Sequence, residues 1–227
     1  MDFRDKRLRV SINVQTEGKS FIIDTGPDFR QQVLRARIEQ LDAVIFTHEH
    51  KDHTAGLDDI RSFNFKQQKP MPVFGTARVL AQLKQEFAYI FSGSDYPGLP
   101  QVNLHEITNQ PFKAEGVTFT PIEVLHYRLP VFGYRIGDFT YITDANFISE
   151  KEKQKIKGSK VIVLNALHHQ QHISHFTLAQ AVELLEELQP EKAFITHISH
   201  QMGLHTKVLP TLPPFIELAY DGLVVYC

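Results

Sequence analysis

A dense group of side chains suited to metal binding lies between residues 48 and 53, where the sequence reads HEHKDH. The group comprises His48, His50, Asp52 and His53. Imidazole nitrogens suit zinc and iron, and a carboxylate adds oxygen ligands that also suit manganese. Alternate residues of a tight loop can face one point, whereas Asp52 and His53 are offset toward a neighbouring point. Because a solvated loop has no need of this composition, the spacing favours a metal site.

Short apolar runs that end in Asp or His indicate where further ligands lie. Four such runs precede Asp24, His48, Asp144 and His197. In layered α/β folds, functional sites collect at the carboxyl ends of strands, where rigid elements hold the side chains of the following loops. Polar residues end many strands, but four endings that are all Asp or His favour a shared site.

Strands and helices alternate between these positions. The patterns predict strands at 10–15, 19–24, 42–47, 117–126, 131–136, 139–143, 160–167 and 192–196, and a hairpin at 217–226 that turns on Asp221-Gly222. They predict helices at 28–37 with Asp28 as the cap, at 76–91, and at 177–190, where Thr177 and Gln180 have capping-box spacing. The alternation indicates an α/β fold of two mixed sheets with helices on their outer faces.

Composition narrows the class of protein. The 227 residues, 42% of them hydrophobic, suit one globular domain that covers 1–227. No apolar run approaches the roughly 18 residues that a membrane helix needs, so no membrane partner is expected. A formal net charge of −2 argues against duplex nucleic acid as a partner. The single cysteine, Cys227, suits a reducing cytosol, and a cytoplasmic location is expected.

The segment THEHKDHTAGL resembles the His-x-His-x-Asp-His signature of the metallo-β-lactamase superfamily, and the resemblance extends over most of the chain. It implies an αββα four-layer sandwich that holds two metal ions. The ligands it implies are His48, His50 and His126 for one ion, Asp52, His53 and His197 for the other, and Asp144 between them. Asp24 would accept a ring N–H from a ligand histidine, and His200 would support the site from outside the ligand set.

Within the superfamily, the segments IDTGPDFR, LPVFGYRIGDFTYITDA, SHFTLAQA and LQPEKAFITHISHQMG are similar to the phosphoribosyl cyclic phosphate phosphodiesterases. The resemblance implies a phosphodiesterase with two zinc or manganese ions, iron being an alternative. A metal-bridging hydroxide would attack a small phosphodiester, cyclic or open-chain, with Asp52 in the catalytic centre and His175 protonating the leaving oxygen. The chain opens at MDFRDKRLRV without the first strand usual in this branch. That opening would expose a sheet edge and would disturb the contacts of a homodimer, which is one expected assembly.

Two alternatives to this function stay open. The first is another hydrolase of the superfamily: a nuclease, a thioesterase or a lactonase. The 18-residue interval between His126 and Asp144 leaves no room for the tRNA-gripping arm of tRNA-processing nucleases. The second alternative is a catalytically silent metal-containing protein that binds a nucleotide or a partner.

Three further side chains are candidates for substrate contact: Arg30, Arg61 and His172. Guanidinium groups pair with phosphate oxygens in bidentate fashion. An ordinary salt bridge is the alternative for each arginine. The neighbouring His168 and His169 are expected at the surface.

Overall fold

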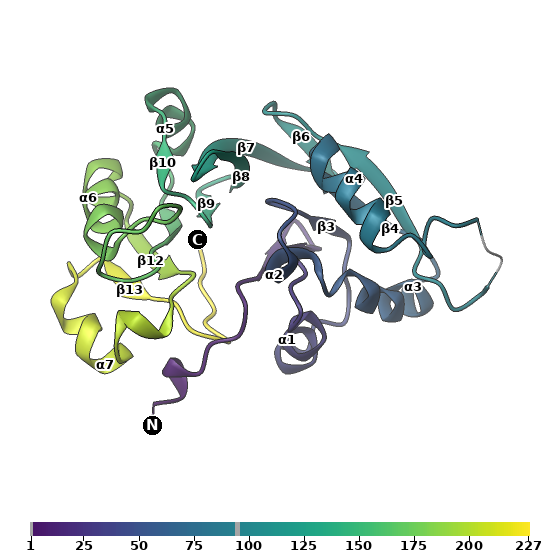
Figure 1. The fold of residues 1–227 in the computed structure, drawn as a ribbon, viewed down its shortest axis with the longest axis horizontal. Helices are drawn as coiled ribbons and strands as arrows, with labels where there is room; N and C mark the ends of the chain where they lie inside the picture. Colours follow the sequence, from purple (N-terminus) through teal and green to yellow (C-terminus); the bar gives the residue numbers. More distant parts are fainter. Residues whose placement is uncertain (1, 94–95) are drawn as a thin grey trace. The chain divides into compact units, whose positions relative to one another are not determined.

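The computed structural model describes residues 2–93 and 96–227, which form two compact units (Figure 1). The unit Arg9–Val117 carries the HEHKDH segment and is called the motif unit. The C-terminal unit is Thr118–Cys227 together with the N-terminal segment, residues 2–8. Each unit has its own sheet and its own helices. None of the helices in the described ranges is long and apolar enough to cross a membrane.

The motif unit is built on a five-stranded sheet in the order β1-β2-β3-β4-β5. The predicted hairpin is confirmed, because β1 (Ile12–Thr16) and β2 (Lys19–Ile23) pair antiparallel. The remaining neighbours pair in parallel: β3 (Ala43–Ile45), β4 (Met71–Gly75) and β5 (Val102–Glu106). The strands β4 and β5 were not predicted. Proline at position 72 argues against a strand, and β5 is too exposed to show an apolar run.

Helices of the motif unit bury one face against this sheet. They are α1 (Phe29–Ala36), α2 (Lys51–Thr54), α3 (Arg61–Gln67) and α4 (Ala77–Glu86), with a 3-10 turn η2 (Leu57–Ile60). Phe29, Leu57 and Leu83 belong to the shared core. Two predictions need correction. Asp28 stands at the N-cap of α1, but its side chain accepts from the Arg9 N–H (2.8 Å) instead of a helix N–H. The helix predicted to reach residue 91 ends at Glu86.

The C-terminal unit contains strands in the order β10-β7-β8-β9-β11-β12-β13. After β6 (Phe112–Ala114), the strands β7 (Val117–His126), β8 (Leu129–Ile136) and β9 (Phe139–Ile142) form an antiparallel meander. The strands β11 (Val161–Asn165), β12 (Lys192–Thr196) and β13 (Ile216–Leu218) add in parallel, and β10 (Phe147–Ile148) pairs with β7. The hairpin predicted at 217–226 is wrong, because only Ile216–Leu218 forms a strand, and that strand pairs with β12.

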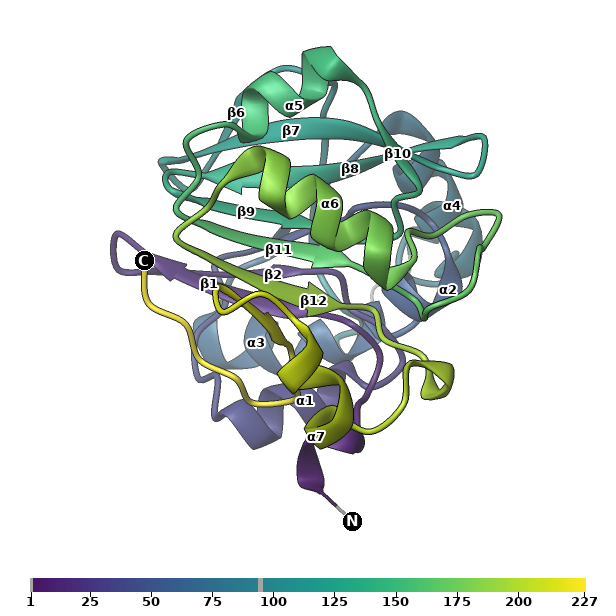
Figure 2. The same cartoon turned by 90° about the vertical axis from the view of Figure 1, so that its left-hand side faces the viewer.

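Helix α6 (Leu178–Leu188) lies across one face of this sheet (Figure 2), where Ala181 and Leu185 enter the core. Its predicted capping box is confirmed: Thr177 and Gln180 satisfy one another's backbone N–H groups. The other helices are α5 (Glu150–Ile156) and α7 (His205–Val208), with short 3-10 turns η1 (Phe3–Asp5), η3 (His200–Met202) and η4 (Leu209–Thr211).

The N-terminal segment is fastened to the far end of its own unit. Arg7 Nε donates to the Ala219 carbonyl oxygen at 2.9 Å, and Arg7 Nη2 lies 3.1 Å from His205 Nδ1. The Asp5 carboxylate accepts from the His205 N–H at 2.7 Å, and the Asp221 carboxylate accepts from the N–H of residue 8 at 3.0 Å. Burial lowers the pKa of both Arg7 and His205. These contacts make the first residues part of the C-terminal unit.

Candidate metal centre

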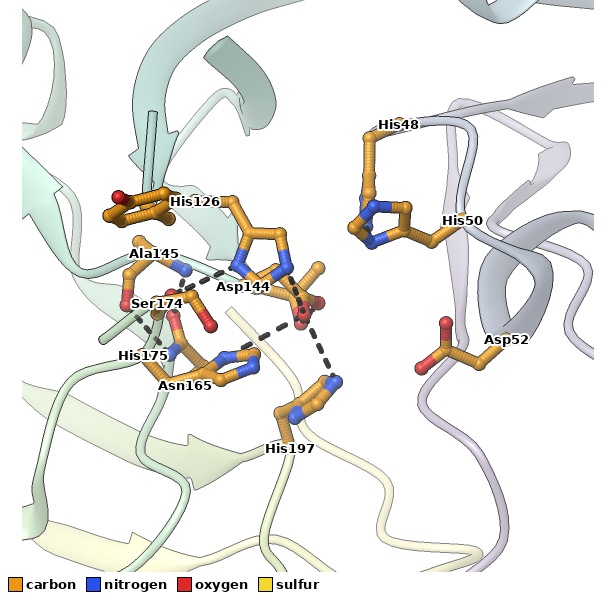
Figure 3. A network of polar contacts seen from close by, with 12 residues as sticks. His48, His50, Asp52, His126, Asp144, Ala145, Asn165, Ser174, His175 and His197 are labelled. Atoms are coloured by element: carbon orange, nitrogen blue, oxygen red, sulfur yellow. Dashed lines mark hydrogen bonds and ion pairs between the residues drawn. The ribbon is translucent and has the colours of Figure 1, made fainter. Parts of the chain in front are cut away.

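The HEHKDH segment follows β3 directly, and its histidines are oriented by oxygen atoms of the motif unit. His48 Nδ1 lies 2.9 Å from Thr47 Oγ1, and His53 Nδ1 lies 2.7 Å from Asp24 Oδ2. Because Nδ1 of each ring faces a protein oxygen, Nε2 is the nitrogen that each ring can offer to a metal. His48 Nε2 points at His50 Nδ1 at 3.0 Å, as Figure 3 shows. These two nitrogens could therefore bind the same ion.

Asp24 is the hub of this arrangement. Its carboxylate is fully buried and accepts from the Thr47 N–H and from Thr47 Oγ1, both at 2.8 Å, besides facing His53. A carboxylate at 2.7 Å keeps the proton of the His53 ring on Nδ1. Asp24 lies at the end of β2 with φ 66°, a left-handed conformation that costs a non-glycine residue energy. Asp24 was predicted to accept a ring N–H from a ligand histidine, and in the structure it faces the ring of His53.

Two glycines allow the loop after β2 to pack under the HEHKDH segment. A Cβ atom on Gly26 would lie 2.4 Å from the Asp52 carbonyl oxygen. A Cβ atom on Gly56 would lie 2.3 Å from the Gly26 carbonyl oxygen. No side chain fits at either distance, so both positions require glycine. This close backbone contact fixes the height of Asp52 and His53 above the sheet.

A second cluster lies within the C-terminal unit, where three imidazoles surround one carboxylate oxygen (Figure 3). The distances from Asp144 Oδ1 are 3.2 Å to His197 Nε2, 3.7 Å to His175 Nδ1 and 4.0 Å to His126 Nε2. Asp144 follows β9 and His197 follows β12, and both adopt left-handed φ values, 55° and 53°. Strain of this kind at strand ends is common in functional sites.

Neighbouring groups hold this second cluster in its orientation. Thr143 Oγ1 donates to Asp144 Oδ2 at 2.8 Å, which leaves Oδ1 as the oxygen facing the rings. His126 Nδ1 lies 2.9 Å from the Ser174 carbonyl oxygen, so Nε2 is again the nitrogen directed at the carboxylate. The buried Asn165 side chain brackets Ala145, accepting from its N–H at 2.7 Å and donating to its carbonyl oxygen at 2.9 Å. That bracket fixes the backbone immediately after Asp144.

The surroundings of His175 leave one ring nitrogen without a hydrogen bond and shift the pKa of the ring. Among the described residues, its buried Nδ1 has no hydrogen-bond partner. Burial lowers the pKa of His175 to about 3, against the opposing effect of the Asp144 carboxylate, so the ring is neutral at pH 7. His126, Asp144 and His175 could hold an ion together. Imidazoles around a buried carboxylate are a donor set that fits a divalent cation.

A model of the family described as "Beta-lactamase superfamily domain" matches residues 19–198 of the chain. The chain belongs to this family. The match contains both clusters, from Asp24 to His197.

The chain resembles several proteins of different names. It is 38% identical over 225 residues to an octanoyltransferase of Porphyromonas gingivalis (strain ATCC BAA-308 / W83), covering 98% of this chain and 45% of that protein. It is 27% identical over 147 residues to a ribonuclease Z of Mycobacterium sp. (strain KMS), covering 58% of this chain and 52% of that protein. The chain therefore spans about half the length of these curated relatives.

Among solved structures, the chain matches a diphosphatase from the PhnP family with a TM-score of 0.91. The two are 36% identical, and the match covers 98% of this chain and 85% of that one. This likeness confirms the predicted fold class and the predicted superfamily.

The remaining histidines near the second cluster differ in burial and in their contacts. The His172 ring lies 5.1 Å from the His175 ring, so it borders the second cluster. The expectation that His168 is a surface residue is wrong: it is buried, with its ring 5.7 Å from that of His172. His169 is exposed, and its Nε2 lies 2.9 Å from the Met202 carbonyl oxygen. His200 is exposed at the start of η3, and within the described ranges no contact joins it to the cluster.

The two arginines expected to meet substrate make ordinary contacts in the motif unit. Arg30 Nη1 lies 3.7 Å from Asp59 Oδ1, and Arg61 Nη1 donates to the Gly98 carbonyl oxygen at 3.3 Å. A different arginine lies beside a predicted ligand: Arg9 Nη1 is 3.7 Å from Asp52 Oδ2. Sequence reasoning missed Arg9, because nothing in the run RLRV distinguishes it from a solvated charge.

Proposed function

We propose that this chain is one domain along its whole length and that it hydrolyses small phosphoric diesters with the help of two divalent metal ions. The observation that carries the proposal is the orientation of the ligand histidines. The Nδ1 atoms of His48, His53 and His126 face protein oxygens, so that Nε2 of each ring is the metal-facing nitrogen. This arrangement favours a metal site, because metal-binding histidines almost always donate their other ring N–H to a protein oxygen or water.

In this proposal, each ion takes three residues and shares a fourth. By the resemblance to the superfamily, His48, His50 and His126 would hold one ion, Asp52, His53 and His197 would hold the other, and Asp144 would contribute to both. Within the C-terminal unit, the ligand atoms of His126, Asp144 and His175 lie within 4.8 Å of one another. Zinc and manganese suit imidazole and carboxylate together, and iron is the alternative. Two such ions, when bound, supply Lewis acidity toward phosphoryl oxygen and an activated water near neutral pH.

His175 provides the proton that the leaving oxygen requires. Its neutral ring lies beside Asp144, and burial is what keeps its pKa low. An anionic phosphoryl group bound next to the ring would raise that pKa, because an opposite charge favours the protonated imidazole. His175 would then carry a proton only when substrate is present. This change would make His175 a more efficient proton donor, because the pKa of a general acid must lie near the working pH when the proton is transferred.

A diphosphate is the second candidate substrate. The relative that favours it is the PhnP-family diphosphatase, which is 36% identical and shares the fold along most of both chains. Diphosphates and phosphodiesters present the same group to a pair of ions: an anionic phosphoryl with an oxygen leaving group. Octanoyl transfer is not carried over, because the chain covers 45% of the relative that bears that name. Ribonuclease activity has less support, since that match covers 58% of the chain.

The test begins with protein purified without chelator, whose zinc, manganese and iron are counted per chain. The loaded protein is then assayed on bis(p-nitrophenyl) phosphate, on a ribose cyclic phosphodiester and on ADP. We expect about two ions per chain and turnover of at least one phosphorus ester. Protein that holds two ions and hydrolyses none of them would contradict the proposal. His175→Ala should keep both ions and lose turnover by a factor of about 100 or more; retention of turnover would remove His175 from its role.

A further inference from the structure

Arg9 begins the motif unit, and its guanidinium lies beside a proposed metal ligand. Arg9 Nη1 is 3.7 Å from Asp52 Oδ2, and Asp52 Oδ2 is in turn 3.8 Å from His53 Nε2. The Arg9 side chain is 60% exposed, and that of Asp52 is 31% exposed. Both groups can therefore be reached by a molecule in solution. The positive charge of Arg9 therefore lies next to a side chain that is proposed to bind an ion.

The backbone of Arg9 is held on both sides, so its side chain starts from a fixed point. Its N–H donates to the Asp28 carboxylate at 2.8 Å, and its carbonyl oxygen accepts from Gln32 Nε2 at 2.6 Å. Both partners belong to α1 or its cap. The turn at Gly26 packs against the same place, because a Cβ atom there would lie 3.3 Å from Arg9 Cβ and 2.4 Å from the Asp52 carbonyl oxygen. Asp28 is thus diverted from capping its helix to anchoring Arg9.

The Arg9 side chain makes few contacts. A guanidinium carries five N–H donors in a planar fork. In the part of the chain that the structure describes, the Arg9 head has one charged neighbour, at 3.7 Å, which is longer than a hydrogen bond. A rigidly anchored arginine with available donors next to a ligand carboxylate suits bidentate capture of a phosphoryl group. Arg30, by contrast, is 74% exposed and faces the ordinary carboxylate of Asp59.

We propose that Arg9 binds the phosphoryl oxygens of the substrate and holds them beside the ion that Asp52 ligates; this inference rests on the proposed function. Two parallel N–H···O bonds from Arg9 would fix one face of the phosphoryl group. Arg9 would also compensate the charge of an anionic substrate as it approaches Asp52. The alternative is that Arg9 only orients Asp52, in which case its loss would weaken metal binding and leave substrate binding unchanged.

The experiment compares Arg9→Ala and Arg9→Lys with wild-type protein and with a control, Lys66→Ala. Lys66 also carries one positive charge in the motif unit, but its partner is the exposed Glu39 at 3.1 Å. Three quantities are measured on metal-loaded protein: ions per chain, KM for the best phosphoester, and the Kd of inorganic phosphate by calorimetry. We expect Arg9→Ala to keep its ions and to raise both KM and Kd by about tenfold or more, because a hydrogen-bonded charge pair is lost. Lysine should restore part of this effect, and Lys66→Ala should match wild type.

Three results would overturn the inference. One is an unchanged KM and phosphate Kd in Arg9→Ala. Another is a loss of ions with unchanged KM for the centres that remain loaded, which would make Arg9 a positioning residue for Asp52. The third is an equal effect of Lys66→Ala, which would indicate a general charge effect. Loaded wild-type protein that hydrolyses no phosphoester would contradict the proposed function instead, and the phosphate titration would then still decide the role of Arg9.

Discussion

The two ligand clusters are built in opposite ways. In the motif unit, four proposed ligands lie within six consecutive residues, and one buried carboxylate, that of Asp24, orients the segment. In the C-terminal unit, His126, Asp144 and His197 are dispersed along the chain, and the carboxylate at the centre of the cluster, that of Asp144, is itself a proposed ligand. The first cluster depends on a local loop and one side chain. The second depends on the register of a sheet.

That register explains why distant residues meet. In the parallel pairing of β9 with β11, Ile142 is opposite Leu164, and in that of β11 with β12, Leu164 is opposite Ile195. Asp144 and His197 each follow their strand by one or two residues, so both emerge at the same edge of the sheet. A shift of one residue in either strand would turn these side chains to the other face.

Asp144→Ala should have the largest effect, because this carboxylate faces three imidazoles in its cluster. We expect at least one ion to be lost from the purified protein and turnover to fall by more than about 100-fold, beyond what loss of an outer partner causes. Metal analysis and the phosphodiester assay measure both. Asp138→Ala is the control, since Asp138 forms a surface ion pair with Lys160 at 2.7 Å. Two ions and near-normal turnover in Asp144→Ala would show that the dispersed cluster is not a metal site.

Asp24→Asn should have the next largest effect and tests the hub of the motif unit. An amide can accept from Thr47, but it cannot keep the His53 proton on Nδ1 as a carboxylate does. We expect metal affinity to fall by about 10- to 100-fold, and the free energy of unfolding by about 1–3 kcal/mol because buried partners lose a charged acceptor. Competition with a chelator and urea denaturation give the two values. Unchanged metal affinity would mean that the contiguous cluster needs no hub.

Asn165→Ala probes the pair of hydrogen bonds that fixes the backbone immediately after Asp144 in the C-terminal unit. It removes two buried hydrogen bonds to Ala145. We expect the free energy of unfolding to fall by about 2 kcal/mol, since both backbone groups would lose their partner. Metal affinity should fall less than in Asp24→Asn, because Asn165 acts through the backbone. If Asn165→Ala weakens metal binding more than Asp24→Asn does, the contrast between the two clusters fails.

The two clusters are not equally easy to predict from the sequence. HEHKDH is recognisable because its ligands are contiguous, and the Asp or His endings of apolar runs locate Asp24, Asp144 and His197. Other features could not be predicted from the sequence. Two examples are that Asp28 anchors Arg9 instead of capping α1, and that His168 is buried. These depend on which distant backbone lies next to each side chain. The wrong hairpin at 217–226 has the same origin, because residues 216–218 pair with β12.

The smallest effect concerns pH and His205, which helps to hold the N-terminal segment. Burial lowers the pKa of His205 below its ordinary value of about 6.5, so the unfolded chain takes up this proton more readily. The contribution of His205 to stability is therefore fully present above pH 6.5 and is lost as the pH falls. His205→Asn keeps an acceptor for Arg7 without a titrating ring. Urea denaturation between pH 8 and pH 5.5 should show a shallower loss of stability in this variant, and equal slopes would contradict the prediction.

The fastening of the N-terminal segment also sets an order of events during synthesis. The motif unit is one continuous stretch, Arg9–Val117, so it can fold as soon as that stretch has left the ribosome. The C-terminal unit cannot be completed then, because residue 8 bonds to Asp221, 213 positions later. Residues 2–8 must therefore wait until Asp221 has been made. A nascent chain that has folded through Val117 would carry residues 2–8 without their partners until α7 and the residues after β13 emerge.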